Sequence, residues 1–136
     1  TVALVIQALL FGDGGITALG ANCFNMAFVE VFVGYYLYRL LSGSSKVISG
    51  RRVFAAGFAG FAGLNAAAFT TAFLLGIQPA LHRAPSGESL YCPYGLNVAI
   101  PMMMGAHILI FGWIEANVTA LVVNYLQKQN VSLLEA

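Results

Sequence analysis

The sequence predicts an all-α protein that folds as a polytopic helical membrane bundle. Of its 136 residues, 60% are hydrophobic and only 8% are charged, and the mean hydropathy is +0.83. Because a soluble domain has about 25% charged residues, this chain has too few polar side chains to cover a surface that faces water. In lipid the backbone must satisfy its own hydrogen bonds, which favours helices. Apolar runs such as "AAAFTTAFLLG" do not alternate as the strands of a membrane barrel would.

Four apolar segments are expected to lie in the membrane, at about 1–11, 21–41, 53–77 and 96–125. A span needs roughly 20 residues, so the first segment is expected to be the end of a span that begins upstream. The opening "TVALVIQALLF" has neither an initiator Met nor a basic flank. We therefore expect residues 1–136 to be the C-terminal portion of a longer protein, forming a single transmembrane domain. The fourth segment is long enough to tilt.

The basic residues predict which side of the membrane each connection faces. The connection between the second and third spans and its flank hold most of them: Arg39, Lys46, Arg51 and Arg52. Lys128 follows the last span, whereas the long connection at 78–95 holds Arg83 beside Glu88. Because cytoplasmic loops are enriched in Lys and Arg, the middle connection and the C-terminus are expected to be cytoplasmic. The Gly-rich connection after residue 11 and the 78–95 connection are expected to face outside.

The third span begins with a stripe of small residues, Ala56, Gly57, Ala59, Gly60 and Gly63. Small side chains at four-residue spacing let another helix backbone approach closely. The favoured interpretation is packing within this protein, and the alternative is a docking face for a separate membrane subunit. The same span adds three groups that we expect to form hydrogen bonds between helices: Asn65, Thr70 and Thr71.

Three ionisable residues lie inside the predicted spans, namely Glu30, His107 and Glu115. Each costs about 2.5–3.5 kcal/mol at the centre of a membrane helix on insertion scales. His107 and Glu115 lie about 12 Å apart along one helix and cannot pair directly. Each is left with Arg39, a polar group of another helix or a water-filled cavity as its partner. For His107 and Glu115 the favoured role is a hydrogen-bonded structural one, and the alternative is a subunit contact or a polar group on a transport path. Glu30 is likewise a candidate for a subunit contact or a buried polar group.

Several classes of site are excluded or disfavoured. The net charge of +1 argues against nucleic acid as a partner, because phosphate binding needs clustered Lys and Arg. "GDGGITALG" lacks the spacing and ending of a nucleotide-binding loop, and "SGSSKVISG" contains no nucleophile elbow. Cys23 and Cys92 lie far apart and form no C-x-x-C pair, which argues against a structural metal site made of cysteines. A disulfide between them is left open. The two histidines, His82 and His107, lie on different elements.

Two blocks of the chain resemble the CbiM/NikM family, the substrate-capture membrane components of energy-coupling-factor transporters for cobalt and nickel. "IQALLFGDGGITALGANCFNM", at 6–26, is similar to the family signature "LQALLFGxGGxTxLGANxxNM". "LNVAIPMMMGAHILIFGWIEANVTALVV", at 96–123, is similar to a late helix of the family, in which a His precedes a Gly-x-x-Glu-Ala-x-Val-Thr pattern. The resemblance covers essentially the whole chain.

The resemblance implies a subunit of the prokaryotic cell (inner) membrane that captures Co²⁺ or Ni²⁺ from outside as the transported substrate. Its implied partners are a transmembrane coupling subunit and cytoplasmic ATPase subunits, with a small accessory membrane subunit left open. The metal ligands of the family are its amino terminus, a His at the second position and a His in an upstream T-S-x-H stretch. All of these precede Thr1, so the resemblance implies no direct metal ligand, catalytic residue or ATPase site within these 136 residues. Nitrogen ligation of this kind suits nickel or cobalt.

The resemblance also gives the Gly-rich segment a role around the metal. Many family members have a His where this chain has Asp13, which implies either that this position is not an obligatory ligand or that metal entry differs in this protein. At the outer mouth, Asp13 is expected to attract the dication electrostatically rather than to ligate it. We expect Asn22 to cap the following helix. A gating role, or support for the ligands, competes with a plain tight turn. The residues concerned are Gly12, Asp13, Gly14, Gly15, Thr17 and Asn22.

Two other classes of function compete with a transporter subunit. An intramembrane enzyme would use Glu30, His107 or Glu115, but no acid, base and nucleophile converge at a plausible spacing. A self-contained channel or carrier would need polar residues aligned along the spans, and the chain has few. The sequence does not choose between cobalt and nickel.

Overall fold

The computed structural model describes residues 2–12 and 18–129, and these are predominantly helical, with no named strand. The predicted all-α fold class is confirmed. Short π-helical stretches, labelled η, interrupt the α-helices. The elements in chain order are α1 (Val2–Ile6), η1 (Gln7–Phe11), α2 (Leu19–Asn22), η2 (Cys23–Val29), α3 (Glu30–Ser42), α4 (Gly50–Gly76), α5 (Gln78–Leu81), α6 (Leu96–Ala106), η3 (His107–Phe111) and α7 (Gly112–Gln129).

Two helices of the described part are long and apolar enough to cross a membrane, Gly50–Leu81 and Leu96–Gln129. They contain the predicted spans 53–77 and 96–125. The elements α2, η2 and α3 run without a break over the predicted span at 21–41. This helix is less apolar than the other two because it carries Asn22, Asn25 and Glu30. The apolar helix Val2–Phe11 is shorter than a span.

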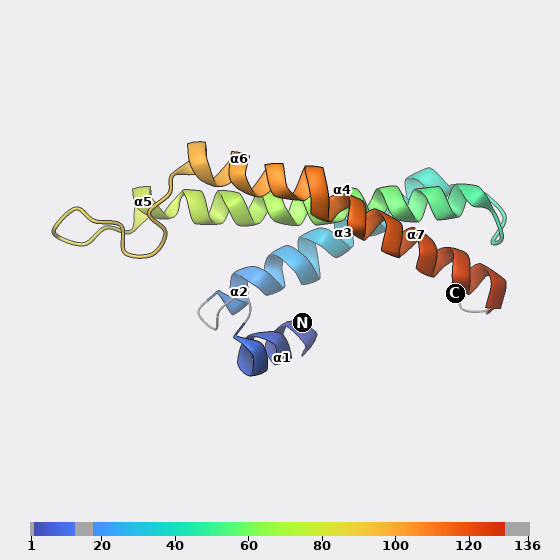
Figure 1. The fold of residues 1–136 in the computed structure, drawn as a ribbon, viewed down its shortest axis with the longest axis horizontal. Coiled ribbons are helices and arrows are strands. Elements are labelled where there is room, and N and C mark those ends of the chain that lie inside the picture. The colour runs from blue at the N-terminus through green and yellow to red at the C-terminus, as the bar shows by residue number, and fades with distance from the viewer. Residues whose placement is uncertain (1, 13–17, 130–136) are drawn as a thin grey trace.

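The helix α4 is the centre of the bundle. It contacts α3, α6 and α7, and Figure 1 shows the continuous α6–η3–α7 helix running beside it along the long axis. The α2–η2–α3 helix crosses α4 at an angle, and α1 lies near α2 at the edge of the structure. Both cavities described below are therefore lined in part by residues of α4.

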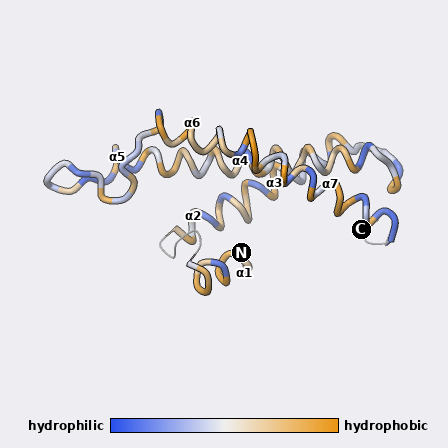
Figure 2. Tube along the Cα trace, viewed as in Figure 1, coloured by the Kyte–Doolittle hydropathy of each residue, from blue (hydrophilic) through white to orange (hydrophobic). Residues whose placement is uncertain are grey.

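The buried apolar core consists of alanines, and the large apolar side chains point outward. The hydrophobic residues that are buried are Ala8, Ala55, Ala56, Ala59, Ala67, Ala68 and Ala72. Phenylalanine, leucine, isoleucine and tryptophan side chains are exposed along the helices. Figure 2 shows hydrophobic colour along much of the helices, with hydrophilic colour at the connections, on parts of the α2–α3 helix and near the end of α7. Lipid is as apolar as leucine, so small residues form the contacts between membrane helices while large ones face lipid. The arrangement is that of a helical membrane bundle.

Polar contacts hold together the end of the bundle at which α3 is connected to α4. Arg51 donates from Nε to the carbonyl oxygen of Leu41 at 2.6 Å. The Ser49 hydroxyl caps α4 by accepting a hydrogen bond from the amide of Arg52 at 3.4 Å. Gln127, near the end of α7, donates from Nε2 to the Ser49 carbonyl oxygen at 3.2 Å. The basic connection and the C-terminal end of α7 therefore lie at the same end of the bundle.

One of the three predicted interhelical groups forms a hydrogen bond between helices. Asn25 donates from Nδ2 to Oγ1 of Thr71 at 2.8 Å and so ties η2 to α4. Thr70 and Asn65 instead donate to carbonyl oxygens of α4 itself. The prediction was therefore wrong for Thr70 and Asn65, because Thr and Asn within a helix can reach the carbonyl of the preceding turn.

Candidate functional site

The small-residue stripe of α4 is packed against α7 and α3. A methyl group added to Gly57 would lie 2.9 Å from the Ala116 carbonyl oxygen, and one added to Gly63 would lie 2.8 Å from that of Glu30. A methyl group added to Gly60 would lie 3.0 Å from Oγ1 of Thr119. Ala56 and Ala59 are buried in the same stripe, each with 4% of its surface exposed. These distances leave no room for side chains, so glycine lets the two neighbouring backbones approach α4.

Glu30 and Glu115, from different helices, converge on this stripe. The Cγ atom of Glu115 lies 3.5 Å from the methyl position of Gly60, and the Cγ atom of Glu30 lies 3.4 Å from that of Gly63. Residues three apart on a helix have side-chain positions about 5–6 Å apart. The two glutamate side chains therefore reach the same face of α4 about one turn apart. Thr119 donates from Oγ1 to Oε1 of Glu115 at 2.8 Å.

The two carboxylates line an open groove of about 410 Å³ between α3, α4 and α7. None of its lining residues is a Lys, Arg or His. Arg39, considered above as a partner for the ionisable residues inside the spans, donates from Nη1 to the hydroxyl of Tyr35 at 3.1 Å. The groove is lined by Glu30, Val31, Gly34, Tyr35, Tyr38, Ala56, Ala59, Gly60, Gly63, Glu115, Thr119 and Val123.

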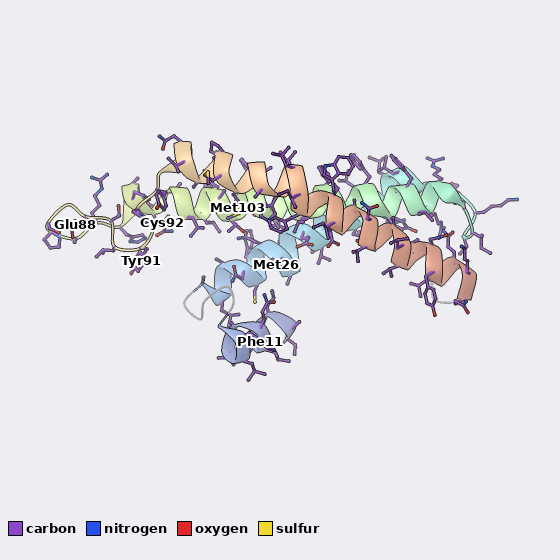
Figure 3. The ribbon with its side chains drawn as sticks, in the orientation of Figure 1. Phe11, Met26, Glu88, Tyr91, Cys92 and Met103 are labelled. Carbon is purple, nitrogen blue, oxygen red and sulfur yellow. The ribbon has the colours of Figure 1, made fainter. Side chains whose placement is uncertain are left out.

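His107 belongs to a second cavity, of about 590 Å³, between α4, α6 and η3. Its Nδ1 donates to the Met103 carbonyl oxygen at 2.8 Å, so this ring is held by its own helix. Figure 3 shows that Cys92 comes from the loop before α6 and Met103 from α6 itself. The cavity is otherwise apolar and is lined by Ala72, Leu75, Cys92, Tyr94, Val98, Ala99, Met102, Met103, Ala106, His107 and Phe111. His107 and Glu115 therefore serve different sites.

Most of the predicted Gly-rich segment falls outside the described residues, namely Asp13, Gly14, Gly15 and Thr17. Gly12 has a φ of 66°, the left-handed conformation that favours glycine. The predicted capping role of Asn22 was wrong. The helix already begins at Leu19, with Ala18 at the cap position, so Asn22 lies inside the helix.

Cys23 and Cys92 are both free thiols, which answers the open question of a disulfide in the structure. Among the residues that the structure describes, no three His, Cys, Asp or Glu side chains gather as a metal site would require. Asn25 was not singled out from the sequence, yet its side chain is 1% exposed and is the largest fully buried one among the described residues. The signal for it was an amide at the centre of an apolar run, within the "CFNM" of the first family block.

The alanine core, the outward apolar side chains and the carboxylates held between helices define a helical membrane protein. Residues 1–133 match the family model CbiM, described as the cobalt uptake substrate-specific transmembrane region. The chain belongs to this family, as the resemblance of its two sequence blocks indicated.

Relatives and solved structures support the same assignment. The chain is 49% identical over 134 residues to the fused nickel transport protein NikMN of Rhodobacter capsulatus, covering 98% of this chain and 39% of that protein. It is 48% identical to the probable fused nickel transport protein LarMN of Lactiplantibacillus plantarum, covering 94% of this chain and 38% of that protein. A crystal structure of a transition metal transporter superposes with a TM-score of 0.84 at 57% identity, covering 93% of this chain and 54% of that one.

Proposed function

We propose that the chain is part of the membrane substrate-binding subunit of an ATP-driven transporter that takes up cobalt or nickel. The observation that carries this proposal is the match of residues 1–133 to the cobalt-uptake family. The nickel transport names of relatives nearly half identical to it support the choice of metal. In the proposed mechanism, this subunit captures the ion outside and works with a transmembrane coupling subunit and ATPase subunits, which supply the energy.

The proposed orientation places the basic end of the bundle in the cytoplasm of a prokaryotic cell. Arg51 and the end of α7 lie at one end of the bundle, because Gln127 bonds to Ser49 beside the basic connection. Figure 3 places Glu88 at the tip of the loop between α5 and α6, at the opposite end of the structure. Charge asymmetry of this kind orients membrane helices with the Lys and Arg loops inside. The Gly-rich segment then faces outside, where the ion arrives.

The test is uptake of radioactive cobalt and nickel into vesicles that contain the full-length protein. We expect uptake to require the coupling subunit, the ATPase subunits and ATP on the side of the membrane that carries the ATPase subunits. The matched control contains ATPase subunits whose nucleotide-binding lysine is substituted, and it should show only background. Uptake by the full-length protein alone would refute the proposal and support a self-contained carrier. A competition between the two unlabelled metals in the same vesicles identifies the preferred ion.

Asp13 is proposed to draw the dication toward the outer face without ligating it. Asp13→Asn should raise the ion concentration for half-maximal uptake a few-fold at low ionic strength, and the effect should shrink as salt screens the charge. Asp13→Glu keeps the charge and should behave as the unsubstituted protein does. A direct ligand would give a loss that is insensitive to salt, and that result would contradict the electrostatic role.

A further inference from the structure

Asn25 places an amide in a core whose buried hydrophobic residues are all alanines. Its Nδ2 donates to Oγ1 of Thr71 at 2.8 Å, whereas its buried Oδ1 accepts no hydrogen bond from any residue that the structure describes. A buried acceptor without a donor lowers stability, so an apolar side chain of similar shape would serve the core at least as well. The amide therefore points to a requirement other than stability.

The bond from Asn25 is the first of two that end on the backbone of α4. The Thr71 hydroxyl, which accepts from Asn25, itself donates to the Ala67 carbonyl oxygen at 2.8 Å. Hydrogen bonds are directional, so this pair fixes η2 at one position along α4 and in one rotation about its own axis. Contacts between alanine surfaces are not directional, and they do not distinguish between neighbouring registers. A polar group in an apolar interface can thus select a single register.

A change of register at Asn25 would reach the far end of the same helix. The element η2 continues α2 without a break, and α2 begins at Leu19, just after the Gly-rich connection. A slip of one residue would move the start of α2 by about 1.5 Å and rotate it by about 100°. Parts of a binding site must be held to within about 0.5 Å to work. A wrong register would therefore disturb an ion site beside the Gly-rich connection.

We propose that Asn25 is a positioning residue for metal capture. Through Thr71 it holds α2 in one register against α4, and so keeps the outer face in the geometry that holds Co²⁺ or Ni²⁺ without touching the ion. This inference rests on the proposed function, because that function supplies the ion and places the Gly-rich connection outside. Asn65 is a contrast, since its Nδ2 donates to the Phe61 carbonyl oxygen of its own helix and this bond fixes no second helix.

The first experiment measures the affinity of the purified full-length protein for Co²⁺ and Ni²⁺ by calorimetric titration. Asn25→Leu and Thr71→Val remove the bond from its two sides, and each should weaken binding at least tenfold. Thr71→Ser keeps the hydroxyl and should bind as the unsubstituted protein does. So should the control Asn117→Leu, which removes an exposed amide bonded to the Trp113 carbonyl oxygen of its own helix. Unchanged affinity in Asn25→Leu or Thr71→Val would overturn the inference, as would an equal loss in Asn117→Leu.

The second experiment measures the register itself and needs no metal. Nitroxide labels replace Phe28 in η2 and Phe69 in α4, which are 50% and 47% exposed, in a full-length protein whose Cys23 and Cys92 are changed to Ser. We expect one narrow distance distribution between the labels, which Thr71→Ser preserves and Thr71→Val broadens or shifts. A distribution that Thr71→Val leaves unchanged would overturn the inference.

The two readouts separate failure of this inference from failure of the proposed function and from misfolding. An unsubstituted protein that binds neither ion would refute the proposed function, whatever the label distances are. Normal ion binding by the unsubstituted protein and by Thr71→Val would refute only the positioning role of Asn25. If Asn25→Leu does not fold, Thr71→Val tests the same bond, because valine matches the shape of threonine. A structural role alone would change the stability of Thr71→Val and leave its ion affinity unchanged.

Discussion

The replacement of Gly63 by alanine tests whether close helix approach determines the stability of the bundle. The added methyl group would lie 2.8 Å from the Glu30 carbonyl oxygen, and ordinary contacts begin at 3.4 Å. The α3 backbone would have to retreat by about 0.6 Å, and overpacking of this kind costs about 1–3 kcal/mol. Alanine regains up to about 1 kcal/mol through its higher helix propensity. We expect a net destabilisation of about 1 kcal/mol.

Gly105→Ala is the matched control, because a methyl group there would meet nothing within 4 Å. It makes the same chemical change in a helix and should stabilise the protein by up to about 1 kcal/mol. The free energy of unfolding is measured for both variants of the full-length protein in mixed detergent micelles as the denaturing detergent is titrated. The difference between the variants isolates the clash, about 1–3 kcal/mol. Equal stabilisation by both substitutions would refute the packing of α3 against Gly63.

The same assay tests three further contacts. A double-mutant cycle of Asn25→Leu with Thr71→Val should give a coupling energy of about 0.6 kcal/mol and at most about 1.7 kcal/mol, and strictly additive effects would show that the hydrogen bond is absent. Gln127→Leu removes the contact with Ser49 and should cost about 0.5–1.5 kcal/mol, while an unchanged midpoint would argue against it. Gly112→Ala should lose about 3 kcal/mol, because its methyl group would lie 2.7 Å from atoms of three residues, and tolerance of alanine there would contradict the packing.

Elements with a strong local signal were predictable from the sequence. The spans at 53–77 and 96–125 lie inside the helices Gly50–Leu81 and Leu96–Gln129, because length and hydropathy alone decide which segments suit a bilayer. The helix that contains Asn22 was predicted to begin at this residue but begins at Leu19. An Asn favours the cap position, but this local preference alone does not fix where a helix starts. The π-helical stretches, such as Cys23–Val29, had no signal in the hydrophobic pattern. A π-turn adds one residue and so rotates the later side chains around the helix, but membrane helices that are apolar all round show no break in the hydrophobic pattern when this happens.

The sequence by itself determined that this protein is a helical membrane bundle and identified its family, because composition and two motif blocks are properties of the chain alone. It also marked Glu30 and Glu115 as costly residues that need partners. Only the tertiary structure decided that these two carboxylates line one groove while His107 belongs to another cavity. The physical reason is that their meeting depends on how closely α3 and α7 approach α4. Glycines at 57, 60 and 63 permit that approach, but the spacing of small residues does not specify which helix fills the space.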